Sequence, residues 1–300
     1  MSTALPPAQP LPFKLLLDEG VRQTRHHFKR IYPAVAIPLA LLAGLLPIAQ
    51  WLMFRSFPTE GGTSPRPWEM IQGVAAFWLA MIVWMAVYYL SYAVLLGAAV
   101  DAVAQRPISM GRTWLSMLRP RMLGTLMLAA GATALGVCCC VVPGIYLGLL
   151  FSFTVPVLVD EGLFGPAAMR RSAELTRYNP QHSLDADPRF KVFVIVFVGF
   201  LLGYAISILV QLPMIVVQQV MIAREVAGGR RVDPATLMAR MSLLQVPAQM
   251  LGMLVNTTVH LYVSFGLALL YVDVKRRREG SDLEAAVEQL VRSHLGAAPS

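Results

Sequence analysis

The stretch MLGTLMLAAGATALGVCCCVVPGIYLGLLFSFTVPVLV, from Met122 to Val159, contains no charged residue. A helix needs about 20 predominantly apolar residues to cross the hydrocarbon core of a bilayer, so this stretch is long enough for two crossings. The Pro143-Gly144 pair inside it is a turn signal. The stretch therefore predicts two spanning helices joined in a tight hairpin.

Four more charge-free windows occur elsewhere in the chain, which as a whole is 56% hydrophobic and only 14% charged. That balance lies outside the range of soluble globular domains. The sequence therefore predicts an all-α polytopic integral membrane protein with six transmembrane helices in three hairpins. The expected transmembrane domain is 31–273, with spans at about 31–54, 70–100, 122–140, 145–160, 191–223 and 241–272.

Shorter segments flank the predicted spans. Residues 1–11 form a Pro-rich tail, which we expect to be disordered, and residues 12–30 have the apolar spacing of an amphipathic helix lying at the membrane surface. Two further cytoplasmic interfacial helices are expected before the third span and after the fourth. Residues 274–300 combine a basic stop-transfer cluster with a short cytoplasmic helix, which Ser281 would cap at its start.

Lysine and arginine are unevenly distributed between the two sides of this topology. The segments that would face the cytoplasm hold 19 of the 25 basic residues if the N-terminus is inside. The expected location is the bacterial cytoplasmic (inner) membrane, with the N and C termini cytoplasmic and no cleaved signal peptide. Attraction to anionic lipid headgroups explains the net charge of +8, so no nucleic-acid partner is required.

The fourth predicted span ends at two adjacent acids, Asp160 and Glu161, which are followed by several arginines. Acids beside arginines are compatible with a catalytic site or with the place where the chain leaves the membrane. No nucleophile or metal-ligand cluster stands beside them in sequence, which favours the membrane exit. The predicted contacts to lipid headgroups are Arg112, Arg119, Arg170, Arg171, Arg177, Lys275, Arg276, Arg277 and Arg278.

Two stretches carry a resemblance to a known family: VVPGIYLGLLFSFTVPVLVDEGLFGPAAMRRSAELT and, later, LLYVDVKRRREGSDLEAAVEQ. They resemble the membrane-domain family that accompanies glycerophosphoryl diester phosphodiesterase domains in some bacterial proteins. The likeness covers about 107–178 and 265–290. It implies a polytopic helical membrane module and supplies no catalytic residues, because the phosphodiesterase catalytic domain has no counterpart here. The segment NPQHSLDADPRF is longer than the family pattern leads us to expect.

Polar residues inside the predicted spans are sparse, and one group stands out. Asn256, His260 and Ser264 are spaced by four residues, which places them on one face of the sixth helix. They are compatible with a polar track for a proton, an ion or a solute. They are also compatible with hydrogen bonds that hold helices together, which is the interpretation favoured by the lack of intramembrane carboxylates.

Two other groups contain residue types that are found in metal or redox sites. Cys138, Cys139 and Cys140 are consecutive, which is not the spacing of a metal site. A role as small apolar side chains, or a disulfide to another chain, fits this spacing better. His182, Asp185 and Asp187 could bind a cation, but a solvated loop is the simpler interpretation. No metal or cofactor is therefore predicted.

The sequence as a whole predicts a non-catalytic protein that interacts with membrane lipids, chiefly through anionic headgroups. A membrane protein partner or a homo-oligomer is also possible. The alternative is a small transporter or permease subunit that uses the polar face of the sixth helix, and a membrane-embedded enzyme comes third.

Overall fold

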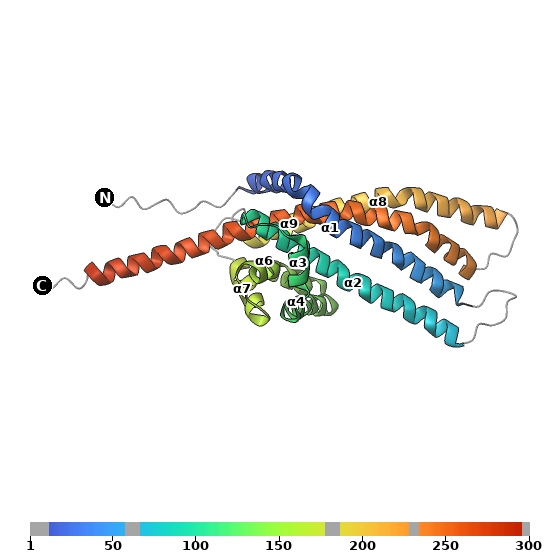
Figure 1. Ribbon diagram of the computed structural model, residues 1–300, viewed down its shortest axis with the longest axis horizontal. Helices are drawn as coiled ribbons and strands as arrows, with labels where there is room; N and C mark the ends of the chain where they lie inside the picture. The colour runs from blue at the N-terminus through green and yellow to red at the C-terminus, as the bar shows by residue number, and fades with distance from the viewer. Residues whose placement is uncertain (1–11, 58–66, 178–186, 228–233, 296–300) are drawn as a thin grey trace. The chain divides into compact units, whose positions relative to one another are not determined.

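The computed structural model describes residues 12–57, 67–177, 187–227 and 234–295, and the regular structure in these ranges is all helical. The helices can be followed by colour along the chain in Figure 1. Their bounds are α1 Phe13–Arg55, α2 Pro67–Val103, α3 Met110–Met117, α4 Pro120–Cys139, α5 Val141–Leu150, α6 Thr154–Asp160, α7 Pro166–Thr176, α8 Pro188–Ala227 and α9 Pro234–Leu295.

The predicted fold class is confirmed. Within the described residues, six helical segments are long and apolar enough to cross a membrane: Phe13–Arg55, Pro67–Val103, Pro120–Cys139, Val141–Asp160, Pro188–Arg224 and Leu237–Gly280. Each overlaps one of the six predicted spans, and helix is the expected structure because a long apolar segment in lipid must satisfy its backbone hydrogen bonds within itself. The chain is an all-α polytopic membrane protein.

Helix ends differ from the prediction in two places. The segment predicted as a separate interfacial helix at 12–30 is continuous with the first span, because α1 runs unbroken from Phe13 to Arg55. The short C-terminal helix predicted to begin at Ser281 is likewise the end of α9, which reaches Leu295. The Pro-rich tail at 1–11 lies outside the described residues.

The hairpin between the third and fourth spans turns at Cys140, whose extended backbone separates α4 from α5. Pro143-Gly144, the predicted turn, lies inside the first turns of α5, where a proline costs little because its missing N–H would have no helical partner. Gly144 serves a different purpose. A Cβ at this position would lie only 2.7 Å from Cα of Val137, so glycine lets α4 and α5 approach closely.

The predicted fourth span, 145–160, is not one uninterrupted helix. A turn at 151–153 separates α5 from α6. At 1.5 Å per residue the ten residues of α5 extend only about 15 Å, roughly half the thickness of a hydrocarbon core. Phe153, the last residue of this turn, is fully buried, and its ring packs against Tyr271 of α9.

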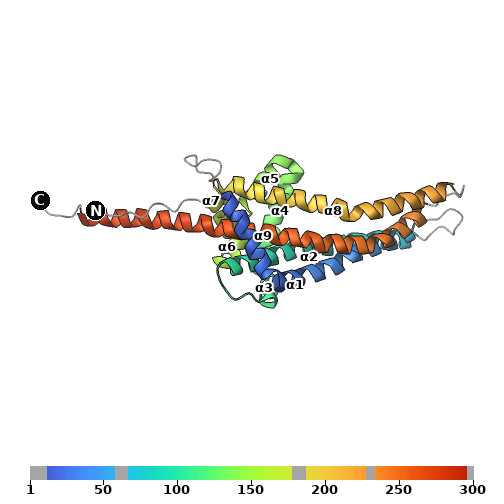
Figure 2. The same cartoon turned by 90° about the horizontal axis from the view of Figure 1, so that it is seen from above.

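The chain divides into two compact units. Unit 2 comprises His27–Leu95 and Val198–Leu261, and therefore holds long parts of α1, α2, α8 and α9. These four parts run alongside one another in both views (Figure 1, Figure 2). Close packing is marked by Gly44 of α1, which faces Met250 of α9, and by the Tyr32 hydroxyl, which donates to the Leu254 carbonyl at 2.9 Å.

Unit 1 comprises Met1–His26, Leu96–Phe197 and Tyr262–Ser300. It contains α3 to α7 together with the neighbouring ends of the long helices. Its core is dense, with Met117, Phe153, Leu175, Phe265 and Tyr271 all fully buried. Ser172 of α7 fixes the turn between α5 and α6, because its hydroxyl donates to the Leu150 carbonyl at 2.7 Å and accepts from the Phe153 amide at 3.1 Å.

Candidate functional site

The acid pair of the fourth span lies at the end of α6 in unit 1. Asp160 is the last residue of α6 and Glu161 follows it, and each side chain is only 14% exposed. Gly162 and Gly165 then adopt positive φ angles of 66° and 62°, which reverse the chain before α7 begins at Pro166. The Gly165 amide donates to the Thr125 hydroxyl at 2.7 Å, so α4 holds this elbow in place.

Two side chains of α9 reach the acid pair. Lys275 Nζ lies 2.6 Å from Asp160 Oδ2 and 3.7 Å from Glu161 Oε1. The Tyr271 hydroxyl lies 3.0 Å from both Asp160 Oδ2 and Glu161 Oε1, and its single proton is shared between the two carboxylates. Tyr271 and Lys275 are one helical turn apart, so the same face of α9 presents both groups.

Two arginines complete the arrangement, which we call the clasp: Asp160, Glu161, Tyr271 and Lys275 with Arg106 and Arg171. Arg106, in the segment after α2, pairs with Asp160, and Arg171 of α7 pairs with Glu161 at 2.9 Å. The clasp therefore joins α6 to α7, to α9 and to the end of α2 within unit 1.

Charges inside the clasp are nearly balanced, with Glu279 and Asp101 adding carboxylates at its edges. Burial alone would lower the pKa of Arg171, but the hydrogen bond and charge of Glu161, with the charge of Glu279, raise it above its ordinary value. The arginine therefore stays charged at all physiological pH values. In the described part of the chain, the side chains that bond to the two acids are arginine, lysine and tyrosine, an arrangement typical of a structural ion-pair network.

The nine predicted headgroup residues fall into two groups. Three with partly buried side chains are engaged in ion pairs, since Arg171 and Lys275 belong to the clasp and Arg277 pairs with Asp273 at 2.7 Å. Arg278 donates to the backbone carbonyl of Arg177 at 3.0 Å. The remaining five have exposed side chains: Arg112, Arg119, Arg170, Arg177 and Arg276.

The exposed arginines differ from the clasp cations in what they contact. Arg170 is 84% exposed and its pair with Glu174 lies within one turn of α7, on the surface. The side chains of Arg112, Arg119 and Arg276 have no partner among the described residues. Their role as headgroup contacts stays a prediction.

The polar residues of the sixth span are placed in different units. Asn256 and His260 belong to unit 2, and Ser264 belongs to unit 1. His260 Nε2 lies 2.6 Å from the Tyr88 hydroxyl, and its ring packs edge-on against both Tyr88 and Tyr92. Asn256 faces Gly203 of α8. Ser264 is fully buried, and its hydroxyl has no partner in the described part of the chain.

The remaining sequence candidates show no assembled site. Cys138, Cys139 and Cys140 are free and exposed at the turn between α4 and α5. His182 and Asp185 lie outside the described residues, whereas Asp187 is buried and accepts from the Arg189 amide at 2.9 Å. Among the residues that the structure describes, no group of three or more His, Cys, Asp or Glu could hold a metal ion.

Two contributors to the clasp were missed by sequence reasoning. The sequence places Arg106 in a segment between two predicted spans, and Tyr271 falls within the predicted span 241–272. The four-residue spacing of Tyr271 and Lys275 was the local signal that could have suggested a shared partner. The identity of that partner depends on packing between segments more than 100 positions apart.

The chain matches no protein-family model, no curated protein and no solved structure. The resemblance to the membrane domain that accompanies glycerophosphoryl diester phosphodiesterases therefore stays an expectation from sequence.

Proposed function

We propose that this chain is a non-catalytic module of the bacterial inner membrane that binds anionic lipid headgroups, with both termini in the cytoplasm. The observation that carries the proposal is the contrast between two groups of basic residues within unit 1. One group is neutralised by carboxylates inside the clasp. The other group, with Arg112, Arg119, Arg170, Arg177 and Arg276, has exposed side chains.

This division supports a structural role for the acids and a binding role for the exposed arginines. A cation that is already paired with two carboxylates has little further attraction for a phosphate. An exposed guanidinium keeps donors available for phosphate oxygens, which it can bind in a bidentate manner. Arg170 uses its Nε for the surface pair with Glu174 and keeps its two NH2 groups for this purpose. Each basic group near an anionic membrane surface contributes about 1 kcal/mol of attraction.

The charge count of the chain agrees with this proposal. Unit 1 holds 17 of the 25 lysines and arginines. By the positive-inside rule, short segments rich in lysine and arginine remain on the cytoplasmic side. A protein partner with an acidic surface, or a second copy of the chain, would compete with lipid for the same arginines.

The test is lipid binding by the whole protein in mild detergent, measured by native mass spectrometry with phosphatidylglycerol and phosphatidylcholine. In the Arg119→Gln, Arg170→Gln double variant, the affinity for phosphatidylglycerol should fall roughly tenfold or more. Binding of phosphatidylcholine should not change. The matched control is Arg119→Lys, Arg170→Lys, which keeps both charges and should keep most of the affinity. Equal affinities of the glutamine and lysine variants would refute the proposal.

A further inference from the structure

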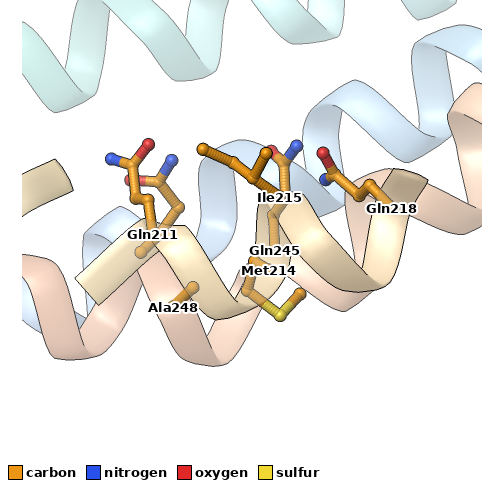
Figure 3. A pocket seen from close by; sticks show the side chains of 7 residues that line it. Gln211, Met214, Ile215, Gln218, Gln245 and Ala248 are labelled. Atoms are coloured by element: carbon orange, nitrogen blue, oxygen red, sulfur yellow. The ribbon is translucent and has the colours of Figure 1, made fainter. Parts of the chain in front are cut away.

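A small cavity lies between α8 and α9 within unit 2, with a volume of about 70 Å³. It is lined by Gln211, Gln218, Gln245 and Gln249, together with Met214, Ile215 and Ala248. Figure 3 shows the amides of Gln211 and Gln218 directed to the same side of α8, where Gln245 of α9 also lies. Four carboxamides therefore converge in a region built from two predicted membrane-spanning helices.

Helical spacing explains the convergence. Gln211 and Gln218 are two turns apart on α8, and Gln245 and Gln249 are one turn apart on α9, so each helix directs its pair to one face. Met214, Ile215 and Ala248 supply the apolar part of the lining.

Most of these amides lack a protein partner. Gln211 donates to the Ser207 hydroxyl at 3.1 Å. Gln218, Gln245 and Gln249 make no hydrogen bond to any other residue that the structure describes. Gln218 and Gln245 are half-buried and Gln249 is exposed, so these amides are accessible to an occupant that could supply hydrogen bonds within the spanning segments.

Prolines add further hydrogen-bonding capacity at the same level. Pro213 follows Gln211 by two positions in α8, and Pro247 lies between Gln245 and Gln249 in α9. A proline inside a helix removes one backbone donor and leaves the carbonyl four residues earlier without its partner. Interrupted backbone at membrane depth is tolerated where it lines a cavity or is covered by protein.

The chemistry of the lining selects the class of ligand. None of the seven lining residues is charged, so an ionic group would enter without a counter-charge. A carboxamide both donates and accepts hydrogen bonds, and a hydroxyl group does the same. We propose that this cavity binds a small neutral polyol, with the amides of Gln218, Gln245 and Gln249 bonding to its hydroxyl groups.

The polyol has two possible sources, which share this chemistry. One is a free solute such as glycerol, and the other is the terminal glycerol of a phosphatidylglycerol headgroup. The proposal is independent of the lipid-binding function above, because none of the exposed arginines of unit 1 lines the cavity.

The experiment uses the whole protein in phosphatidylcholine nanodiscs, with binding of free glycerol detected by saturation-transfer NMR. A second arm compares phosphatidylglycerol with phosphatidic acid, which is anionic but lacks the terminal glycerol, by native mass spectrometry. The variants are Gln218→Leu and Gln245→Leu, singly and together. The matched control is Gln219→Leu, an exposed glutamine next in the chain that does not line the cavity.

Support takes one of two forms. Glycerol binding that weakens roughly tenfold or more in the double variant, and persists in Gln219→Leu, identifies a free solute. A preference for phosphatidylglycerol over phosphatidic acid that disappears only in the cavity variants identifies the lipid headgroup. If the arginine variants lose binding to both anionic lipids and the cavity variants do not, the result supports the proposed function. It does not change the conclusion about the cavity.

Three outcomes overturn the inference. The first is that neither glycerol nor the terminal glycerol of the lipid is recognised by the unchanged protein. The second is that recognition survives in the double variant. The third is that the double variant changes a dimer into a monomer without altering polyol binding, which would assign the glutamines to a contact between copies of the chain. Circular dichroism and size-exclusion profiles check that each variant is folded.

Discussion

Replacing Asp160 by Asn should destabilise unit 1 by about 2 kcal/mol. Asp160 accepts from Lys275 at 2.6 Å, from Tyr271 at 3.0 Å and from Arg106, and its side chain is 14% exposed. Removing one partner of a fully buried ion pair costs about 3–5 kcal/mol, whereas exposed pairs contribute only about 0.2–1 kcal/mol. Asp160 lies between these limits. Asn keeps the size of the side chain and one acceptor, so the change isolates the loss of charge.

The ion pair between Asp160 and Lys275 has a coupling free energy that can be measured. In a double-mutant cycle with Asp160→Asn and Lys275→Gln, the coupling free energy should be about 1–2 kcal/mol, because each single change removes the same short ion pair. Lys275 keeps Glu161 and Glu279 at 3.7 Å, which limits the effect of losing Asp160. The assay is unfolding of the purified protein in mixed detergent micelles, followed by circular dichroism.

A matched control separates the clasp from ordinary surface pairs. Glu174→Gln removes the exposed pair with Arg170 on α7, and should cost only about 0.2–0.5 kcal/mol. The reasoning is refuted if Asp160→Asn costs no more than Glu174→Gln. It is also refuted if the coupling between Asp160 and Lys275 is close to zero, since the clasp would then contribute nothing as a unit.

Three further substitutions test contacts within unit 1 or within unit 2. Ser172→Ala should lower the free energy of unfolding by about 1–3 kcal/mol, since the buried Phe153 amide loses its acceptor. A fall in melting temperature no larger than that caused by Ser116→Ala would contradict this prediction. Gly144→Ala should weaken the α4–α5 hairpin, because the new Cβ meets the backbone of Val137, whereas Gly124→Ala meets nothing within 4 Å and should be neutral or slightly stabilising in the same melt. His260→Leu should lower the free energy of unfolding by about 1 kcal/mol because the Tyr88 hydroxyl loses its partner, whereas His260→Gln should be nearly neutral. Equal melting temperatures for the two variants would argue against a structural hydrogen bond.

The six spans were predictable because the positions of charges report directly on burial in lipid. Arg30 and Arg55, for example, bracket an apolar stretch that α1 does contain. The turn at Cys140 was not predictable from the same pattern, because Pro143 is equally acceptable in a turn and in the first turns of a helix. Local sequence signals do not distinguish these two placements.

The candidate site was predictable only in its local parts. Asp160 and Glu161 were identified as the end of a span, and Tyr271 and Lys275 share a helical face by their spacing. That these four groups meet depends on how α6 packs against α9, which is a tertiary property. The glutamine cavity is similar, since the sequence shows polar residues in α8 and α9 but not that their amides converge.

The account is tested most directly by measuring on which side of the membrane the exposed arginines of unit 1 lie. They can bind headgroups of the cytoplasmic leaflet only if they lie on the cytoplasmic side. Cys138, Cys139 and Cys140 would be replaced by Ser, and single cysteines would be introduced by Gly62→Cys and Arg170→Cys. The account predicts that a membrane-impermeant maleimide labels position 62 in intact cells and position 170 only after the membrane is permeabilised. Labelling of position 170 from outside, with position 62 protected until permeabilisation, would contradict it.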